Sequence, residues 1–491
     1  MPKRNIVALL ATCLACLAFW AARERSGPAR RFGEVMAAIE SRYLRDTDPD
    51  ALFQAAVDAT VAKLDEHSAY LRGSRRASLE AALDQRFGGV GLDLALDTAT
   101  QRPVVVSPLY ASPAWRAGIA PGDTILAIDG NDTHGWPLSD TVERLRGRPG
   151  DAVSVRIAAA ALTTTLDPAA LPSESAAPRE VVLVREVVQI ESVLGDRRRA
   201  DGSQDWMLEG EPGVALVRIT GFGERTGEEF TAACRELDAV KGKGLKLCVI
   251  DLRHNPGGLV QAAVEVCDAL LGEGPIVATR GRGDGGTAVL QERRATAGAF
   301  LEGVPVAVLV DGLTSSSAEI VAACLQDAGR ATVVGGRTYG KGTVQTILPL
   351  SGDTGLLKLT TAEYLRPSRE PIHRQPAAAE ADDWGVKPDA GYELVPTAEV
   401  AERLREWRRR RDIVGPPGAM PSSTGETRPA RDIDPVLARA LDIIRGEERR
   451  LPRGSHPPER SSLLRPRFPR GPQDAARARA RRQDLPPVVV S

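Results

Sequence analysis

Three short segments of this 491-residue chain carry residue types that could perform catalysis. The first is the serine cluster at residues 314–318, Thr-Ser-Ser-Ser-Ala, which follows the strand-like run 304–311 and opens a helical run. A hydroxyl at such a turn lies near backbone N–H groups and the positive end of the helix dipole. This environment suits a nucleophile whose attack creates an oxyanion. An ordinary serine N-cap would give the same local pattern.

The second segment is residues 251–258, Asp-Leu-Arg-His-Asn-Pro-Gly-Gly, which ends an apolar strand-like run and precedes a helical one. Two adjacent glycines let the backbone approach another group closely and offer N–H donors to it. The segment is therefore a candidate for holding an oxyanion. A tight strand-to-helix turn without any catalytic role is the alternative.

The third segment is residues 340–345, Gly-Lys-Gly-Thr-Val-Gln. A serine hydroxyl needs a base near neutral pH, and a desolvated lysine with a lowered pKa can serve as one. Gln345 follows Lys341 by four residues and could hold its amine. The alternative is a solvated lysine in a glycine turn, which we expect for Lys243.

Other chemistries are disfavoured by the motifs. Residues 335–341 fit a phosphate loop until Gly342 replaces the Ser or Thr that would bind magnesium, and a strand rather than a helix is expected to follow. Residues 281–286 match Gly-x-Gly-x-x-Gly but predict a hairpin or loop. The GxSxG, SxxK and HExxH motifs are absent, and no Cys/His cluster has zinc spacing. We expect neither a metal nor a cofactor, and buried thiols at Cys234, Cys248, Cys267 and Cys324.

Composition narrows the class further. Lys and Arg number 64 against 65 Asp and Glu, a net charge of −1, which excludes a generally basic nucleic-acid binder. Residues 449–491 hold eleven arginines against three acidic residues, a charge of +8, so this Arg/Pro-rich tail is expected to be disordered. At the other end, Pro2-Lys3-Arg4 precedes the apolar run 6–22, which predicts an export signal or a membrane anchor. The bulk of the chain is therefore expected outside the cytoplasm, in the periplasm or cell envelope.

The elements that position these segments follow from hydrophobic patterning. Residues 32–71 predict amphipathic helices, the second beginning at Asp48-Pro49 and running to Leu64. Short β-rich runs follow from 87 to 190, with a loop inserted at 158–178. From Gly213 strands alternate with helices near 227–240, 259–271 and 316–328, which predicts a crossover α/β core. Further helices are expected at 397–411 and 434–446.

In this order, the segments resemble the carboxyl-terminal processing peptidases, or tail-specific proteases, over roughly residues 30–395. Residues 64–71 are similar to the family's helical lead-in, and residues 112–130 to a strand–turn–strand of a PDZ domain. The glycine, serine and lysine segments and residues 384–389, Trp-Gly-Val-Lys-Pro-Asp, fall in family order. The resemblance implies a mixed α/β (α+β) multidomain fold with N-terminal helices, a PDZ domain and a peptidase core.

The resemblance also implies site roles by position. The nucleophile would be Ser316, the general base Lys341, and the residue supporting the lysine Gln345. The oxyanion hole would use the backbone N–H of Ser317 and of a glycine; the two candidate glycines are Gly257 and Gly258. This sequence departs from the family where Ser317-Ala318 reverses the usual Ala-Ser, so Ser315 and Ser317 flank the implied nucleophile as neighbouring hydroxyls.

The segment that resembles the carboxylate-binding loop of a PDZ domain would recognise an unstructured C-terminal tail of a protein or peptide substrate. It consists of Phe87, Gly88, Gly89, Val90, Gly91 and Leu92. The implied function is a serine endopeptidase cleaving near C-termini; a catalytically inactive PDZ scaffold that kept the fold is the alternative. The expected divisions of the chain are 1–27 signal or anchor, 28–86 helical region, 87–190 PDZ domain, 191–395 peptidase core, 396–448 helices and linker, and 449–491 basic tail.

Overall fold

The computed structural model describes residues 27–159, 177–199, 201–283, 288–296, 298–350, 355–412, 430–445 and 489–490. The chain divides into two compact units, residues 1–70 and 71–491. In the first unit, α2 (Gly27–Arg42) is followed by α3 (Pro49–Val61), whose start at Pro49 confirms the prediction. The Asp48 side chain caps α3 by accepting hydrogen bonds from the N–H groups of Asp50 and Ala51.

The second helix, predicted to run to Leu64, ends at Val61. The prediction that residues 64–71 are helical is wrong, because they contain a turn and a strand. Asp65 Oδ1 accepts hydrogen bonds from the backbone N–H groups of His67 and Ser68, both at 2.7 Å. Such a local side-chain acceptor offers the backbone an alternative to the helix. The turn leads into the short strand β1 (Ala69–Leu71). The apolar run 6–22 lies outside the described residues, and none of the helices that are described has the length and apolarity to cross a bilayer.

The second unit opens with α4 (Gly73–Asp84) and contains an antiparallel sheet in the order β3-β4-β5-β7-β8. Its strands are β3 (Leu92–Asp97), β4 (Arg102–Pro108), β5 (Thr124–Ile128), β7 (Ala152–Ala158) and β8 (Arg179–Val184), with β6 (Asn131–Asp132) on β5. Helices α5 (Pro113–Arg116) and α6 (Leu138–Leu145) accompany the sheet. A separate ladder joins β2 (Arg86–Gly89) to β9 (Glu186–Gln189). Most of the inserted loop, 160–176, lies outside the described residues.

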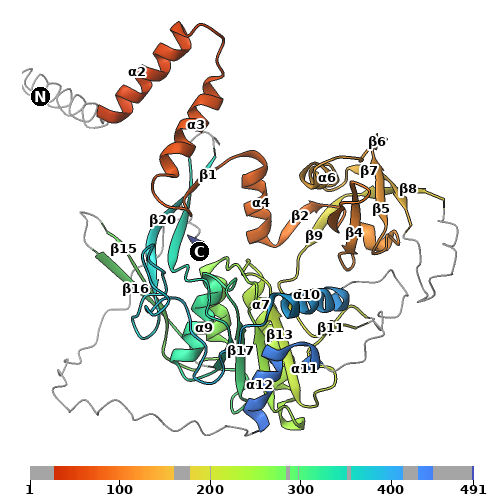
Figure 1. Cartoon of the computed structure of the whole chain (residues 1–491), viewed down its shortest axis with the longest axis vertical. Coiled ribbons are helices and arrows are strands. Elements are labelled where there is room, and N and C mark those ends of the chain that lie inside the picture. Colours follow the sequence, from red (N-terminus) through yellow and green to blue (C-terminus); the bar gives the residue numbers. More distant parts are fainter. Residues whose placement is uncertain are drawn as a thin grey trace, which may run out of the picture. The chain divides into compact units, whose positions relative to one another are not determined.

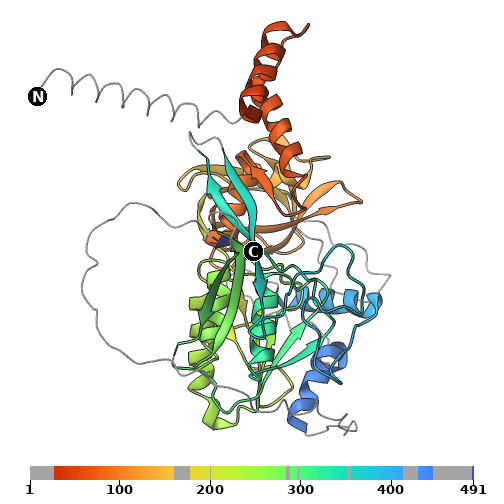
Figure 2. The same cartoon turned by 90° about the vertical axis from the view of Figure 1, so that its left-hand side faces the viewer.

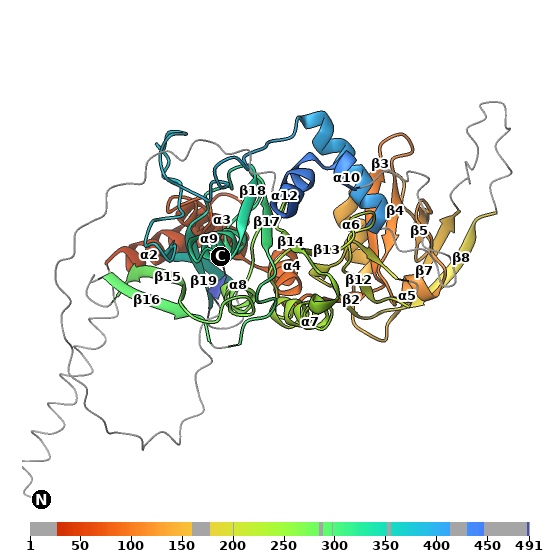
Figure 3. The same cartoon turned by 90° about the horizontal axis from the view of Figure 1, so that it is seen from below.

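The crossover α/β core is confirmed by a five-stranded sheet in the order β10-β13-β14-β17-β18. The strands are β10 (Val193–Leu194), β13 (Val214–Ile219), β14 (Leu247–Asp251), β17 (Val306–Val310) and β18 (Thr332–Gly335), the last four parallel. Two helical layers enclose this sheet (Figure 3). One face is covered by α7 (Thr226–Asp238), α8 (Val260–Asp268) and α9 (Ser317–Asp327). The other face is covered by α10 (Ala398–Asp412), α11 (Ala430–Ile433) and α12 (Pro435–Arg445).

Alternation along these strands explains the two layers. Val217 points into the apolar cluster shared with α7, α8 and α9, whereas its neighbour Leu216 points into the cluster with Trp407 and Leu441. Strands β14 and β17 are parallel neighbours, so their carboxyl ends lie at the same edge of the sheet. The glycine segment follows β14 and the serine cluster follows β17, and this topology brings the two together.

A second sheet is antiparallel and has the order β16-β15-β20-β19-β21. Its strands are β15 (Pro275–Arg282), β16 (Ala288–Arg294), β19 (Thr343–Pro349), β20 (Leu356–Leu365) and β21 (Val489–Val490). Strands β15 and β16 confirm the hairpin predicted around 281–286, and β19 with β20 forms a longer one, drawn in cyan in Figures 1 and 2. Strand β21 lies in the tail that was expected to be disordered throughout. Smaller elements are η1 (Lys241–Lys243) and the pair β11 (Arg197–Arg198) and β12 (Gln204–Asp205).

Candidate active site

Ser316 lies at a strained turn between β17 and α9. It is the N-cap of α9, is fully buried, and has φ +63° and ψ −119°. Non-glycine residues rarely adopt such a conformation, and strain of this kind gathers at functional sites. An ordinary N-cap has extended backbone angles instead. Ser316 Oγ makes no hydrogen bond among the described residues.

The two flanking serines are engaged differently from Ser316. The Ser315 hydroxyl donates to Pro256 O at 3.0 Å, and the Ser317 hydroxyl donates to Gly258 O at 3.1 Å. Both hydroxyls therefore tie the serine turn to the glycine segment, 59 residues earlier in the chain. Of the three neighbouring hydroxyls, the one on Ser316 is not used in this structural link.

Gly257 lies directly against the serine turn. Its φ is +95°, and a Cβ placed on it would meet Ser316 Cβ at 2.7 Å and Ser317 N at 3.0 Å, so a side chain does not fit. The Gly257 N–H donates to Asn255 Oδ1 at 2.9 Å, while Asn255 O accepts from Ser315 N at the same distance. The glycine backbone thus approaches the serine turn closely, as an oxyanion site requires.

His254 and Asp311 form a further link between the same two segments. His254 Nδ1 lies 2.7 Å from Asp311 Oδ2, and the His254 N–H donates to Asp311 Oδ1 at 3.0 Å. The hydrogen bond that the His254 side chain donates to Asp311 raises the pKa of His254. Burial of Asp311 opposes its ionisation, but the His254 contacts outweigh it and lower the pKa of Asp311 to about 2. His254 lies in the glycine segment and Asp311 shortly before the serine turn, and no sequence pattern indicated that the two side chains pair.

Glu319 joins the serine turn to the lysine segment. Its fully buried carboxylate accepts hydrogen bonds from the N–H groups of Ser316 and Lys341, both at 2.8 Å. It also accepts from Gly340 N at 2.7 Å and from Thr338 Oγ1 at 2.5 Å. Burial raises the pKa of Glu319, and the four donors lower it by less. Sequence reasoning gave Glu319 no role, although its place three residues after a serine N-cap is a signal that it reaches back to the cap.

Lys341 is half-buried and directly precedes Gly342 and β19. Gln345, in β19, is fully buried, and its Nε2 donates to Thr343 Oγ1 at 2.9 Å and to Thr360 Oγ1 at 3.3 Å. Gln345 Oε1 has no hydrogen-bond partner among the described residues. A buried acceptor of this kind suits an ammonium or amine donor from a neighbouring lysine.

The six-residue segment expected to bind a carboxylate is divided between two structures. Phe87, Gly88 and Gly89 belong to β2 and pair with β9, whereas Val90 and Gly91 form the turn into β3 at Leu92. Gly91 has φ +75°, and a Cβ on it would lie 2.3 Å from Ser112 Cβ, so the turn needs glycine. Strand β3 stands at one end of the described sheet, which makes it an edge to which an extended peptide could add.

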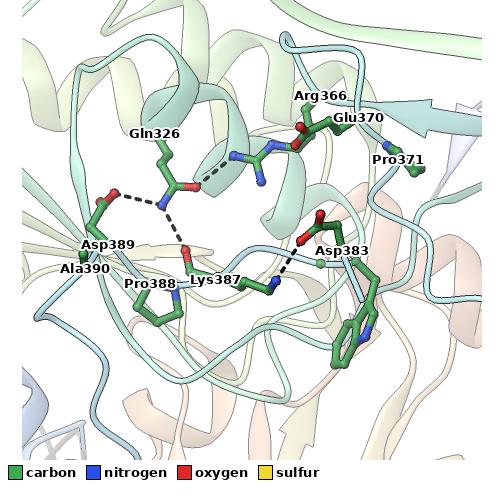
Figure 4. Close-up of a pocket in the computed structure, with 11 residues that line it drawn as sticks. Gln326, Arg366, Glu370, Pro371, Asp383, Lys387, Pro388, Asp389 and Ala390 are labelled. Atoms are coloured by element: carbon green, nitrogen blue, oxygen red, sulfur yellow. Dashed lines mark hydrogen bonds and ion pairs between the residues drawn. The ribbon is translucent and has the colours of Figure 1, made fainter. Parts of the chain in front are cut away.

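A separate pocket of about 230 Å³ lies beside the C-terminal end of α9 (Figure 4). Gln326 crosses it by donating to Lys387 O at 2.9 Å and Asp389 Oδ1 at 3.2 Å and accepting from Arg366. Most of the family-like segment lines it, and neither Ser316 nor Lys341 does; the lining residues of the segment are Trp384, Gly385, Lys387, Pro388 and Asp389. These contacts fix the segment to α9 and are consistent with a structural role.

The described residues contain no group of three His, Cys, Asp or Glu side chains placed to hold a metal ion. The four cysteines of the core are buried, as predicted. Burial raises the pKa of Cys248 to about 12, so this thiol stays protonated at neutral pH.

Comparison with known proteins identifies the family. A model of peptidase family S41 matches residues 213–391, and a PDZ domain model matches residues 104–158. A carboxy-terminal-processing protease of Bartonella bacilliformis is 33% identical over 339 residues, which cover 69% of this chain and 71% of that protein. The chain belongs to peptidase family S41. The family resemblance inferred from the sequence is thereby confirmed, as is the multidomain α/β fold class.

Two further proteins are similar to this chain. The carboxy-terminal processing protease CtpA of Bacillus subtilis is 28% identical over 366 residues, covering 74% of this chain and 68% of that protein. The solved photosystem II D1 C-terminal processing protease is 26% identical with a TM-score of 0.40, covering 77% of this chain and 96% of that one. As a member of peptidase family S41, the chain is a serine peptidase of a family characterised by a Ser-Lys dyad, with a PDZ domain and peptide substrates.

Proposed function

We propose that this S41 peptidase cleaves proteins near their C-termini outside the cytoplasm, with Ser316 as nucleophile and Lys341 as general base. One observation carries the assignment: the buried carboxylate of Glu319 accepts hydrogen bonds from the backbone N–H groups of both residues. The strained backbone of Ser316 and the structural engagement of the Ser315 and Ser317 hydroxyls support the choice among the three serines.

The proposed reaction follows from these groups. Neutral Lys341 takes the proton of Ser316 Oγ as that oxygen attacks the peptide carbonyl, while Gln345 Oε1 holds the lysine amine. The backbone N–H of Ser317 and that of Gly257 or Gly258 hold the oxyanion. Lys341 then gives its proton to the leaving amine. Water, deprotonated by Lys341, hydrolyses the acyl-enzyme.

The substrate proposal rests on the PDZ turn. Backbone N–H groups of residues 90–92 would hold the terminal carboxylate of an unstructured tail, and the tail would extend along β3. The names of the relatives, carboxy-terminal processing proteases, support this use. Residues 6–22 would export or anchor the chain, which places its action in the periplasm or cell envelope. The proposal also includes the expected domain boundaries: a helical region at 28–86, the PDZ domain at 87–190, the peptidase core at 191–395, and helices and linker at 396–448.

The test uses protein lacking residues 1–27 and a substrate with a flexible C-terminal tail, with products mapped by mass. We expect Ser316→Ala and Lys341→Ala each to lower kcat/KM by on the order of 10⁴-fold, because either substitution removes one member of the dyad. Lys341→Ala should still bind the tail. Lys243→Ala, a glycine-flanked lysine in η1, is the matched control and should cleave normally. Full activity of Lys341→Ala, or a wild-type chain without activity, would overturn the proposal.

A further inference from the structure

The C-terminal strand β21 lies beside the strand that follows the candidate base. Val490 pairs with Gln345 and Val489 with Thr346 in an antiparallel ladder, on the side of β19 away from β20. Cα atoms of β21 also come within 8 Å of α8. Figure 3 shows this short dark-blue strand next to β19 and α8.

The two elements beside β21 begin directly after the lysine and glycine segments of the candidate site. Strand β19 starts two residues after Lys341, and α8 starts two residues after Gly258. Leu259, the N-cap residue of α8, packs against the apolar cluster of Ile347 in β19 and Leu356 in β20, which joins α8 to this hairpin. Strand β21 therefore touches both elements that lead out of the lysine and glycine segments.

Strand β21 runs toward the lysine segment of the candidate site. Because the ladder is antiparallel, the chain runs from Val489 to Val490 toward lower numbers in β19, and hence toward Lys341. The strand therefore points its C-terminal end toward the candidate dyad.

The sequence of the tail suits this position. The last seven residues, Leu-Pro-Pro-Val-Val-Val-Ser, are uncharged, and their three β-branched residues after two prolines favour an extended strand. The preceding part of the tail is strongly basic. Forty-three residues separate Arg445 from Val489, and at about 3.3 Å each they can span roughly 140 Å, so the connection does not restrict the pairing.

We propose that β21 is a built-in inhibitor that adds to the edge of β19 at the place where the extended part of a substrate binds. The inference rests on the proposed function, since it takes the lysine segment as part of the active site. It also names the peptide class that the edge accepts: an uncharged, extended segment rich in β-branched residues. Tethering keeps such a segment at an effective concentration in the millimolar range, so a weak contact is sufficient to compete with substrate.

The first experiment compares full chains that differ only in the tail. Removal of residues 488–491 should lower KM about three- to tenfold with kcat unchanged, because a competing strand is lost. Val490→Pro should do the same, because proline removes the N–H that a ladder needs. Ala475→Pro, in the same tail but outside β21, is the matched control. An unchanged KM in both the shortened chain and Val490→Pro would overturn the proposal.

The second experiment adds the peptide of residues 485–491 to the shortened chain. It should inhibit competitively, remain uncut by mass spectrometry, and lose its effect when proline replaces its penultimate valine. Inhibition should persist in the shortened Gly91→Ala chain; its loss would mean that the peptide acts at the PDZ turn, and cleavage or non-competitive inhibition would also contradict the proposal.

A binding measurement separates this inference from the peptidase assignment. Fluorescence anisotropy of the labelled peptide on the shortened chain carrying both Ser316→Ala and Gly91→Ala does not depend on catalysis. Saturable binding of the peptide to this variant supports the β19 site. If the wild-type chain then cleaves no substrate, only the peptidase proposal is overturned. Absence of binding, with normal cleavage by the wild-type chain, would overturn the inhibitor and leave the dyad standing.

Discussion

At the scale of single residues, Glu319 determines how the site is held. An ionised carboxylate only accepts hydrogen bonds, and Glu319 uses both oxygens to hold donors from the serine turn and the lysine segment. It is fully buried, so a donor that lost this acceptor would find no water in its place. The backbones of Ser316 and Lys341 are therefore fixed relative to one another by one side chain.

Glu319→Gln tests this positioning role. The amide keeps the shape but presents an NH₂ group where one oxygen accepted, so about two of the four donors lose their acceptor. We expect a loss of about 1–3 kcal/mol in the free energy of unfolding. We also expect a 10- to 100-fold lower kcat with little change in KM, because small displacements of reacting groups have effects of this size.

The measurements are urea unfolding and steady-state kinetics on the same preparations. Glu363→Gln, which removes an exposed ion pair with Arg280, is the control and should change stability by less than about 0.5 kcal/mol. A Glu319→Gln protein that is less stable but has the wild-type kcat would show that Glu319 supports the fold without positioning the dyad.

At the scale of elements, much of the core could be predicted. The helices expected at 316–328 and 434–446 are α9 (Ser317–Asp327) and α12 (Pro435–Arg445), because apolar periodicity alone specifies such buried elements. The link from the Ser317 hydroxyl to Gly258 spans 59 residues, and no local pattern reports it. The same holds for β21, whose pairing with β19 depends on the fold. The prediction of a helix at 64–71 was wrong because the Asp65 side chain accepts backbone hydrogen bonds and forms a turn there.

The turn into β3 gives a prediction at this scale. Gly91→Ala should weaken binding of a C-terminal tail at least about tenfold, because its Cβ would lie 2.3 Å from Ser112 Cβ and would move the turn. Gly118→Ala is a matched control: its φ is also positive, at +69°, but a Cβ there meets nothing within 4 Å. Anisotropy of a labelled tail on Ser316→Ala protein measures both. Equal affinities of the two variants would contradict a role for the turn in carboxylate binding.

At the scale of the whole molecule, the last described helix supports the site from the far end of the chain. Fully buried Asp434 accepts hydrogen bonds from Arg253 Nη1 at 3.0 Å and Nη2 at 2.7 Å, across 181 residues. Arg253 lies in the glycine segment and also pairs with Asp251, the last residue of β14. Helix α12 is thereby joined to the strand end from which the candidate oxyanion loop emerges.

Asp434→Ala should therefore destabilise the whole second unit. The substitution leaves Asp251 as the remaining carboxylate partner of the buried Arg253 guanidinium at this site. It also removes the carboxylate oxygen that caps α12 by accepting hydrogen bonds from the N–H groups of Val436 and Leu437. Breaking a buried ion pair by removing one partner costs about 3–5 kcal/mol. Asp434→Asn, which keeps an oxygen for the cap, should cost less and allows the test even if the alanine variant does not fold.

The control for this change is Asp442→Ala, on the same helix, where the carboxylate pairs with Arg439 at the surface. Such a pair contributes about 0–1 kcal/mol. Urea unfolding measures the stability of the three variants. Residual peptidase activity after heating should be lowest in Asp434→Ala, higher in Asp434→Asn and highest in Asp442→Ala, because the strand end that carries the glycine segment loses its support when Asp434 is changed. Equal losses in Asp434→Asn and Asp442→Ala would mean that α12 is held by its apolar face alone, and that the far end of the chain does not stabilise the site through Arg253.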